Sequence, residues 1–205
     1  SFDEVIIPST VSEISNTAFK ANKVKSFVVD AQSQTYSSDD GILYSSNDSV
    51  LYTYPGGRSD LDYTVKNNVT AIAGRAFDGN EVLKSITFPA EVTAIGGYAF
   101  YGTKLETVIF AADSKLKSIG DYAFATSELR SIEIPVGICT IGRDAFNTTK
   151  LKKIVIPAGV SEIGNTTFKD CTDLLQISLL SNEISLKNNV FHGSGIVAFD
   201  MTETK

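Results

Sequence analysis

The sequence predicts a solenoid of about nine short coils, made mostly of strands and turns with little regular helix. The first observation behind this prediction is a recurring phenylalanine, whose neighbouring copies are mostly 22 to 24 residues apart. The second is a fixed pattern of apolar residues, proline and glycine that accompanies each copy. A period of this size is typical of coils that bury their apolar faces only against the coils before and after them. The recurring residues are Phe19, Phe77, Phe100, Phe124, Phe146, Phe168 and Phe191.

The repeat unit is clearest over residues 151–168, which follow the pattern L-x-x-I-x-I-P-x-x-V-x-x-I-G-x-x-A-F with threonine in place of the alanine. We interpret the whole chain, 1–205, as a single repeat domain. Its repeats lie near 2–23, 24–59 with an insertion, 60–82, 83–104, 105–128, 129–150, 151–173 and 174–195, with a partial repeat at 196–205.

The I-x-I segment of each unit predicts a short, half-buried strand, because apolar residues at alternate positions point to one face of a sheet. In the unit at 151–168, Ile154 and Ile156 are expected to point inward and Val155 outward. Proline follows this segment in four units and is expected to end the strand, since it lacks a backbone N–H and fixes φ. These prolines are Pro8, Pro89, Pro135 and Pro157.

The second half of the unit predicts a buried corner. The V-x-x-I segment is expected to add two apolar side chains to the interior, and the glycine after it to allow a turn that a Cβ atom would block. The small alanine then leaves room for phenylalanine between the coils. Burying such a ring stabilises the fold by about 1.5–3 kcal/mol, and truncating it to alanine costs about 3–5 kcal/mol. The corner glycines are Gly96, Gly120, Gly142 and Gly164.

An insertion at about 34–58 interrupts the period. Two runs rich in β-forming residues, 41–44 and 50–54, flank a polar turn, which predicts a β-hairpin that stands out from the edge of the solenoid. Four of the eight tyrosines lie in this insertion. They form either a contact site or packing between the hairpin and the solenoid flank, and we favour packing.

These residues carry a resemblance to a known family. The repeated I-P-x-x-V-x-x-I-G-x-x-A-F, together with the Y-S-S-D-D-G-I-L-Y and Y-P-G-G segments of the insertion, resembles the BspA-like leucine-rich repeat proteins, also called the Treponema pallidum type. The resemblance covers essentially the whole chain. It implies a right-handed, curved leucine-rich repeat solenoid with a parallel β-sheet on one face. It also implies a bacterial protein, secreted or displayed on the cell surface, that adheres to host or bacterial partners, including extracellular-matrix proteins.

Composition agrees with an extracellular or cell-surface module that does not insert into a membrane. No apolar run approaches the roughly 18 residues that a membrane span needs. The 18 basic and 24 acidic residues give a net charge of −6, which argues against nucleic acid or an anionic membrane surface as partner.

The last unit is degenerate, with Val190 before Phe191 and Lys187 in place of glycine. We expect the chain to be a fragment of a longer protein, trimmed of a signal or anchor.

No catalytic residue, metal site or cofactor is expected. His192 is the only histidine, and we interpret its polar loop as a turn. Asp39–Gly41 with Asn47–Asp48 offers oxygen ligands at the hairpin but lacks the calcium-loop pattern, so turn chemistry explains these residues better. Glu133 and Asp200 should lie about 14 Å apart on the outward strand face, which is too far for a glycosidase pair at roughly 5–9.5 Å.

The two cysteines do not suggest a disulfide. Cys171 lies in the loop after Phe168, whereas Cys139 lies within the V-x-x-I segment of the preceding unit. These positions place the two residues on different walls of the coil. We interpret both as free thiols, partly or wholly buried.

We expect any function to lie in the residues that point outward from the strands, since a solenoid presents a long and nearly rigid strand face. The outward column is mostly apolar or small, and we predict that it is a protein-binding surface. The alternative is that β-branched residues occur there only because strands favour them. The predicted binding residues are Ile6, Val28, Thr87, Ile109, Glu133, Val155, Lys153 and Ser178, beside Ser26, Thr64, Ser85, Thr107, Ser131, Gln176 and Asp200.

Two functions of different classes remain. The first is a non-enzymatic, adhesin-like recognition module that binds a protein of the host or of another cell. The second is a structural spacer that holds another domain away from the envelope and has no ligand of its own. An exposed apolar patch on the sheet face favours the first function. A uniformly polar face favours the second.

Overall fold

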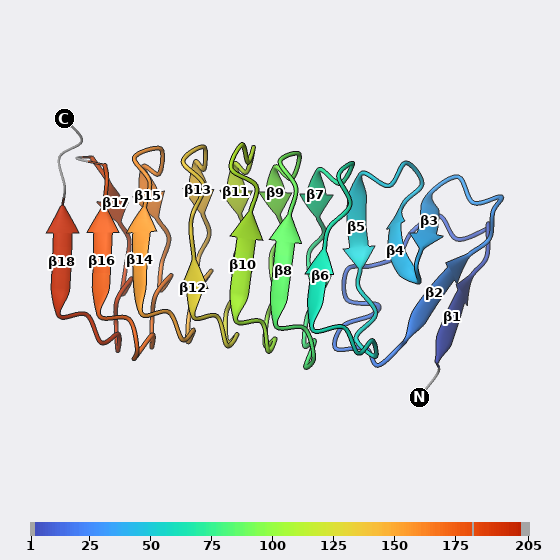
Figure 1. Cartoon of the computed structure of the whole chain (residues 1–205), viewed down its shortest axis with the longest axis horizontal. Coiled ribbons are helices and arrows are strands. Elements are labelled where there is room, and N and C mark those ends of the chain that lie inside the picture. Colours follow the sequence, from blue (N-terminus) through green and yellow to red (C-terminus); the bar gives the residue numbers. More distant parts are fainter. Residues whose placement is uncertain (1–2, 182, 202–205) are drawn as a thin grey trace.

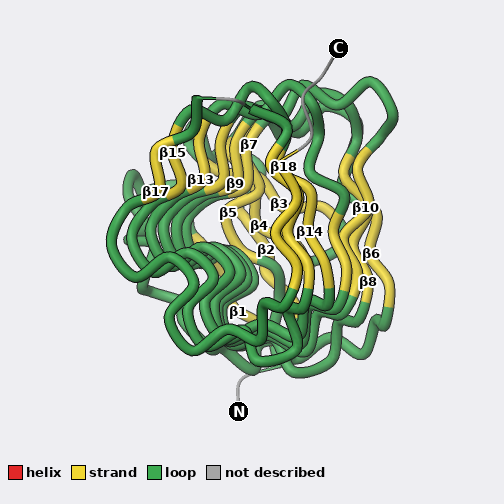
Figure 2. Tube along the Cα trace, turned by 90° about the vertical axis from the view of Figure 1, so that its left-hand side faces the viewer, coloured by secondary structure: helices red, strands yellow, loops and turns green. Residues whose placement is uncertain are grey.

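The computed structural model describes residues 3–181 and 183–201. Over these residues the chain winds into coils stacked along one axis, with strands and turns but no helix (Figure 1). Seen along that axis, the strands gather on walls of the stack and turns connect them (Figure 2). The predicted solenoid of about nine coils is confirmed.

The first wall consists of the I-x-I segments. Neighbouring strands pair in parallel and in register, so that Ile86 lies beside Val108 and Phe88 beside Phe110. The wall is divided into three sheets, with the orders β1-β2, β12-β10-β8-β6 and β14-β16-β18. Its strands are β1 (Glu4–Ile7), β2 (Ser26–Val29), β6 (Asp62–Thr64), β8 (Ser85–Phe88), β10 (Thr107–Phe110), β12 (Ser131–Ile132), β14 (Lys153–Ile156), β16 (Gln176–Leu179) and β18 (Ala198–Met201).

The V-x-x-I segments form a second parallel sheet, which the sequence pattern did not predict. Each segment contributes a strand of two residues that ends at a buried isoleucine, as where Ile95 pairs with Ile119, or in the last segment at the exposed Leu186. Periodicity misses such a strand because alternation becomes visible only over about four residues or more. The strands are β7 (Ala71–Ile72), β9 (Ala94–Ile95), β11 (Ser118–Ile119), β13 (Thr140–Ile141), β15 (Glu162–Ile163) and β17 (Ser185–Leu186).

The insertion lies within the stack, so the prediction of a hairpin that stands out from the edge is wrong. β4 (Ile42–Ser45) is antiparallel to both β3 (Tyr36–Asp39) and β5 (Val50–Thr53), and β5 pairs in parallel with β7. The three strands thereby continue the second sheet. The cause is the run Ile42-Leu43-Tyr44, whose side chains are all buried. A strand that is apolar on both faces has to be covered on both.

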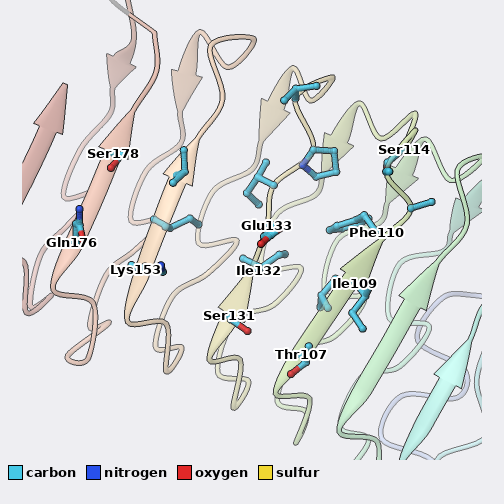
Figure 3. A pocket seen from close by; sticks show the side chains of 18 residues that line it. Thr107, Ile109, Phe110, Ser114, Ser131, Ile132, Glu133, Lys153, Gln176 and Ser178 are labelled. Carbon is cyan, nitrogen blue, oxygen red and sulfur yellow. The ribbon is translucent and has the colours of Figure 1, made fainter. Parts of the chain in front are cut away.

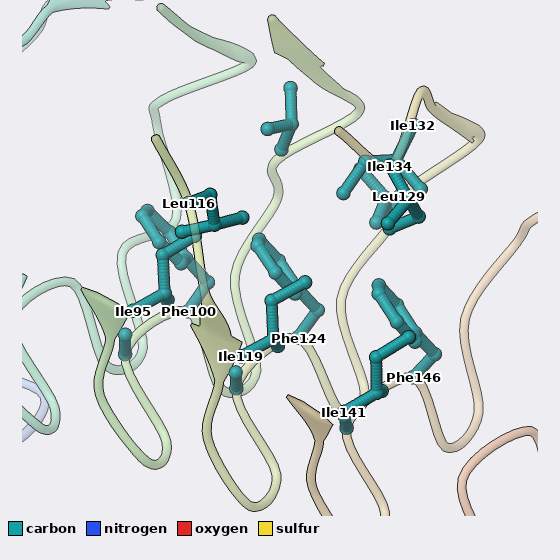
Figure 4. Close-up of a cluster of buried hydrophobic side chains, with 14 of the residues drawn as sticks. Ile95, Phe100, Leu116, Ile119, Phe124, Leu129, Ile132, Ile134, Ile141 and Phe146 are labelled. Carbon is teal, nitrogen blue, oxygen red and sulfur yellow. The ribbon is translucent and has the colours of Figure 1, made fainter. Parts of the chain in front are cut away.

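The two faces of β4 belong to different apolar clusters. Leu43 packs with Ile7, Phe27 and Tyr36 in a small cluster near the first coils. Ile42 and Tyr44, on the opposite face, join the large cluster that runs through the remaining coils, part of which is shown in Figure 4. The insertion therefore lies between the two apolar clusters and separates them inside the solenoid.

The recurring phenylalanines form a continuous stack in the large cluster. Successive ring centroids lie between 4.7 and 5.8 Å apart, and the rings of Phe146 and Phe168 are parallel to within 1°. Phe19 departs from this stack, because it packs edge-on against Phe27 in the small cluster. The stacked residues are Phe77, Phe100, Phe124, Phe146, Phe168 and Phe191.

Close backbone contact explains the corner glycines, as predicted. A Cβ atom on Gly120 would lie 2.6 Å from the backbone nitrogen of Gly97 in the preceding coil. The sequence pattern did not reveal a second feature of the corner. In the six units whose phenylalanines stack, the residue directly before the Ala-Phe pair or its substitute has a φ between 54° and 64°, in the left-handed region. These residues are Arg75, Tyr98, Tyr122, Asp144, Thr166 and Asn189.

Candidate functional site

The strand register arranges the predicted face residues in rows across neighbouring coils. Residues at equivalent positions of the unit lie side by side, with their side chains on the outer surface of the first wall. The paired positions are Ile6–Val28, Thr64–Thr87, Thr87–Ile109, Thr107–Ser131, Lys153–Gln176, Val155–Ser178 and Ser178–Asp200.

The face is not one continuous surface. Ile6 and Val28, which are 68% and 40% exposed, lie in the separate β1-β2 sheet on the far side of the insertion. Ile109 and Val155, which are 47% and 46% exposed, lie on β10 and β14, on either side of β12. The exposed apolar side chains among the predicted face residues therefore lie in two separate places, of which the second is in the middle of the solenoid.

The sheet of the first wall is interrupted between β12 and β14. β12 has two residues, whereas β10 and β14 have four each. In another coil, the residue after the strand donates a backbone hydrogen bond to the last residue of the preceding strand. The N–H of Leu180, for example, donates to the carbonyl of Ile156 at 3.0 Å. Pro135 and Pro157 cannot make this bond, because proline has no N–H. Because these prolines lie in successive coils, the end of β12 lacks this backbone hydrogen bond both toward β10 and toward β14.

A second recurring backbone bond is missing at the same place. The N–H of Glu106 donates to the carbonyl of Lys84 at 2.8 Å, and that of Leu175 to the carbonyl of Lys152 at 3.0 Å. Within residues 3–181 no backbone hydrogen bond joins Lys152 to Arg130, or β14 to β12. The facing edges of β12 and β14 therefore keep unpaired N–H and C=O groups. We call this gap the seam.

A hollow of about 840 Å³ lies over the seam on the outer surface (Figure 3). We call it the seam groove. Its floor reaches the core, since Ile132 and Ile134 are 7% and 8% exposed, whereas Ile86 in an intact part of the wall is fully buried. The exposed apolar side chains at its rim are Ile109, Val136 and Val155.

Two opposite charges border the groove. Glu133 and Lys153 are exposed, and neither forms an ion pair with any residue that the structure describes. Several charges on successive coils elsewhere do pair, as where Glu106 contacts Lys84 at 2.7 Å and Arg130 at 3.2 Å. The two groove charges remain available to a partner.

The acidic residues of the insertion are engaged by basic side chains. Lys66 contacts Asp39 at 2.8 Å and Asp48 at 3.0 Å, and Arg58 contacts Asp40 at 2.9 Å. Burial opposes ionisation of Asp48, but hydrogen bonds from Ser37 and Lys66 outweigh it and hold the pKa of this carboxyl below its ordinary value. Across residues 3–181 and 183–201, no three His, Cys, Asp or Glu side chains are placed to hold a metal ion.

The tyrosines of the insertion pack inward. Tyr36, Tyr44 and Tyr54 are buried, and the hydroxyl of Tyr44 lies 2.8 Å from that of Tyr63. Tyr54 donates a hydrogen bond to Asp60 at 2.6 Å. Burial raises the pKa of Tyr44, Tyr54 and Tyr63 above the ordinary value for tyrosine. These contacts support packing as the role of the rings.

Both cysteines are free thiols, but only Cys171 is buried. The prediction that both are at least partly buried is wrong for Cys139, which is exposed because it lies between the inward-pointing Ile138 and Ile141. Cys171 belongs to a column of small polar residues three positions after the stacked phenylalanines, and its Sγ lies 3.0 Å from the carbonyl oxygen of Phe146. His192 is exposed in a turn.

Sequence reasoning found the residues of the groove but not the groove itself. The signal that could have revealed it is the succession of Pro135 and Pro157 in neighbouring coils, since the other prolines after strands, Pro8 and Pro89, have no proline in the next coil. Periodic patterns describe one coil at a time, whereas the hydrogen bonds that close a parallel sheet join two coils.

Comparison with solved structures shows which proteins the chain is similar to. A leucine rich cell surface protein from Faecalibacterium prausnitzii is 31% identical, with a TM-score of 0.78 over 86% of this chain and 48% of that one. The pneumococcal vaccine antigen PcpA is 19% identical, with a TM-score of 0.82 over 98% and 56%. The leucine-rich repeat protein of T. pallidum is 24% identical, with a TM-score of 0.66 over 83% and 80%. The chain thus spans about half the length of the first two proteins.

Comparison with curated proteins gave no match. None of the segments that the structure describes is a helix long and apolar enough to cross a membrane. A family model described as the BspA type leucine rich repeat region matches residues 1–48, 59–115 and 110–205 in six copies. The stretch it omits, 49–58, lies in the insertion. The predicted resemblance is therefore confirmed, and the chain belongs to the BspA type leucine rich repeat family.

Proposed function

We propose that this chain is a non-enzymatic recognition module, secreted or displayed on a cell surface, that binds a protein partner through the outer face of the first wall. The observation that carries the proposal is the set of exposed apolar side chains on this face. Ile109, Val136 and Val155 surround the seam groove, and Val136 is 86% exposed. Apolar surface gathered in this way is typical of sites that bind other proteins.

The family relationship agrees with this proposal. The protein from Faecalibacterium prausnitzii is named as a cell surface protein and PcpA as a vaccine antigen. A protein exposed on a surface meets proteins of other cells or of the extracellular matrix, so we take these as the class of partner. A spacer without a ligand has no use for exposed Ile109, Val136 and Val155, and we therefore favour recognition over the spacer role.

Binding to a panel of purified extracellular-matrix proteins, including fibronectin, laminin and collagen, tests the proposal. The purified chain is immobilised and affinities are measured by biolayer interferometry. The double variant Val28→Glu/Ile109→Glu should weaken binding at least tenfold, because each glutamate places a charge in an apolar contact.

A matched control carries two glutamates on the other side of the coil. Thr140 and Ser161 are exposed at the second sheet, and Thr140→Glu/Ser161→Glu should leave the affinity unchanged. Circular dichroism checks that both double variants are folded. Equal binding by the wild type and a folded Val28→Glu/Ile109→Glu variant would contradict the proposal, as would failure of every protein in the panel to bind.

A further inference from the structure

We propose that the seam groove binds the tip of a projecting loop of the partner protein, which inserts a large apolar side chain and presents an acidic and a basic residue beside it. This inference rests on the proposed function and names the part of the partner that the first wall recognises. Three features carry it: departures from the repeat that meet at the groove, access to apolar side chains of the core, and two charges of opposite sign.

The first departure from the repeat is a longer loop at one border of the groove. Phe110 and Ile119 lie nine positions apart. The residues they pair with in the preceding coil, Phe88 and Ile95, lie seven positions apart. Insertions within single repeats are often found on the face of a repeat protein that binds a partner. The residues of the longer loop that line the groove are Ala111, Ala112 and Ser114.

The second departure is Val136, directly after Pro135. The same position holds a serine or an alanine in the other coils with this proline, at Ser9, Ala90 and Ala158. Val136 is exposed and lies in a turn beyond the end of β12, so the preference of strands for β-branched residues does not explain it. Departures from local rules are expected at functional sites, and here they meet in neighbouring coils.

The groove also gives access to apolar side chains of the core. Phe110 and Ile134 occupy the inward position at the end of the strand segment, and both line the groove (Figure 3). Phe110 is only partly buried, and Ile134 is 8% exposed. Phe88 and Ile156, at the same position in other coils, are fully buried. An apolar side chain placed in the groove therefore contacts the core and removes these groups from water.

The occupant lies on the outer surface and does not pass between the strands. Ile141 pairs with Ile163 in the second sheet, which holds together the two coils beside the seam. The groove is therefore closed at its floor and open to solvent above. Its volume of about 840 Å³ lies within the range of concave binding sites and exceeds that of one side chain, so the tip of a loop fits it.

Two charges account for the polar part of the recognition. Lys153 lies at the start of its strand, as Ser131 does in the preceding coil, and this end of the groove is polar. Phe110 and Val136 border the opposite, apolar end, and Glu133 lies between the two ends. Among the residues that the structure describes, neither Glu133 nor Lys153 has an ion-pair partner. A loop with a basic residue at Glu133 and an acidic residue at Lys153 completes both pairs.

Selection from a display library of disulfide-cyclised heptapeptides on the immobilised wild-type chain tests this inference, because a cyclised peptide presents a loop tip. Enriched peptides should carry an aromatic residue or leucine together with an acidic and a basic residue. A synthetic copy should bind about fivefold or more weakly to Val136→Ser, which removes exposed apolar surface from the groove.

A matched control is Ala158→Ser, which changes the same position of the next coil. Ala158 is exposed and does not line the groove, so this variant should leave the affinity unchanged. Enrichment of no peptide would overturn the inference. So would equal affinity of the synthetic peptide for the wild type and for Val136→Ser.

Charge reversal tests the polar contacts. Glu133→Lys/Lys153→Glu should weaken binding of the peptide by about tenfold or more, and a peptide with its two charges exchanged should regain the affinity. In the complex with the wild-type chain, nuclear Overhauser effects should join the apolar anchor of the peptide to the methyl groups of Ile134 and Val155. Binding that both charge reversals leave unchanged, or an anchor without contact to Ile134, would overturn the inference.

Two other occupants are distinguished by separate measurements. A glycan array that shows binding to the wild type, lost in Val136→Ser, would assign the groove to carbohydrate. Analytical ultracentrifugation that shows a dimer of the wild type, lost in the same variant, would assign it to a second copy of the chain. Either result would overturn the inference.

The outcomes for the groove and for the proposed function can be separated. Val28 lies outside the groove, so Val28→Glu should leave peptide affinity unchanged while it lowers affinity for a whole matrix protein. If a matrix protein binds equally to the wild type and to Val136→Ser but more weakly to Val28→Glu/Ile109→Glu, the groove inference fails and the proposed function stands. If the cyclised peptide binds and no matrix protein does, the groove inference stands and the proposed function fails.

Discussion

Tyr54 stacks on Phe77, with the ring centroids 4.9 Å apart and the ring planes 21° apart. The insertion thereby supplies a ring to the phenylalanine stack, in a stretch of the chain where the repeat pattern has none. Tyr54 is 2% exposed, and its hydroxyl also donates to Asp60 at 2.6 Å. The insertion is consequently held to the solenoid by the same packing that holds one coil to the next.

Truncation of this ring should destabilise the whole chain. Tyr54→Ala and Phe124→Ala are each expected to lower the free energy of unfolding by about 3–5 kcal/mol, because each variant leaves a cavity in the stack. Tyr54→Phe removes only the hydrogen bond to Asp60 and should cost about 1.5–3 kcal/mol. Urea unfolding followed by circular dichroism measures these differences. A loss below about 1.5 kcal/mol for Tyr54→Ala, which is the lower bound for burying such a ring, would show that the insertion unfolds independently of the coils.

Substitution of a corner glycine should be costly where the preceding coil touches it. In Gly120→Ala the new Cβ atom would lie 2.6 Å from the backbone nitrogen of Gly97, so the two coils have to move apart. We expect a loss of about 1–3 kcal/mol in the free energy of unfolding. Gly137→Ala is the matched control, because its Cβ atom would meet nothing closer than 3.5 Å, and it should change stability by less than about 0.5 kcal/mol. Similar losses for both variants would contradict the steric explanation.

The tyrosine cluster of the insertion predicts a loss of stability at high pH. Burial raises the pKa of Tyr44, Tyr54 and Tyr63 above the ordinary 10.0, so the folded state holds these protons more tightly than the unfolded state. Their contribution is complete below pH 10 and is lost as the pH rises above it. Each tyrosine should lower the free energy of unfolding by up to about 1.4 kcal/mol per pH unit.

Urea unfolding at several pH values from 7 to about 11.5 checks this dependence (the range brackets the ordinary tyrosine pKa). The decline above pH 10 should be shallower in Tyr63→Phe, which has one titrating group fewer. Ultraviolet absorbance of the tyrosinate ion follows the same ionisation directly. An identical slope for the wild type and Tyr63→Phe would show that this residue does not contribute.

The two cysteines should differ sharply in reactivity. Cys139 is exposed, whereas burial raises the pKa of the Cys171 thiol and keeps reagents away from it. Titration of the native chain with a thiol reagent such as Ellman's reagent should therefore modify one cysteine rapidly, and the second only after unfolding. Cys139→Ser should abolish the rapid phase. Rapid reaction of two thiols in the native wild type would contradict the burial of Cys171.

The repeat and the first wall could be predicted because the residue pattern within one coil is enough to show which of its side chains are buried. Ile154 and Ile156 alternate with Val155, and the buried and exposed positions of β14 follow that alternation. The corner at Gly120 could be predicted as well, since glycine recurs where two coils touch. The register of Ile109 with Thr87 then follows from the period alone.

The second sheet and the place of the insertion could not be predicted in this way. Strands as short as β11 (Ser118–Ile119) show no period of their own and exist only because neighbouring coils pair with them. The run Ile42-Leu43-Tyr44 contained the relevant signal, because three consecutive apolar residues in a strand require cover on both faces. The expected projecting hairpin would have left one of these faces in water.

The recurrence of particular residues at particular offsets is enough to specify the coil, the apolar stack and the rows of outward residues. The stacking of the coils, in contrast, leaves β12 and β14 unpaired, opens a groove over Ile132 and Ile134, and leaves Glu133 and Lys153 without an ion-pair partner among the residues that the structure describes. The difference arises because a hydrogen bond across a parallel sheet needs a donor on one coil and an acceptor on the next. That match is a property of two coils stacked together, and no single repeat contains it.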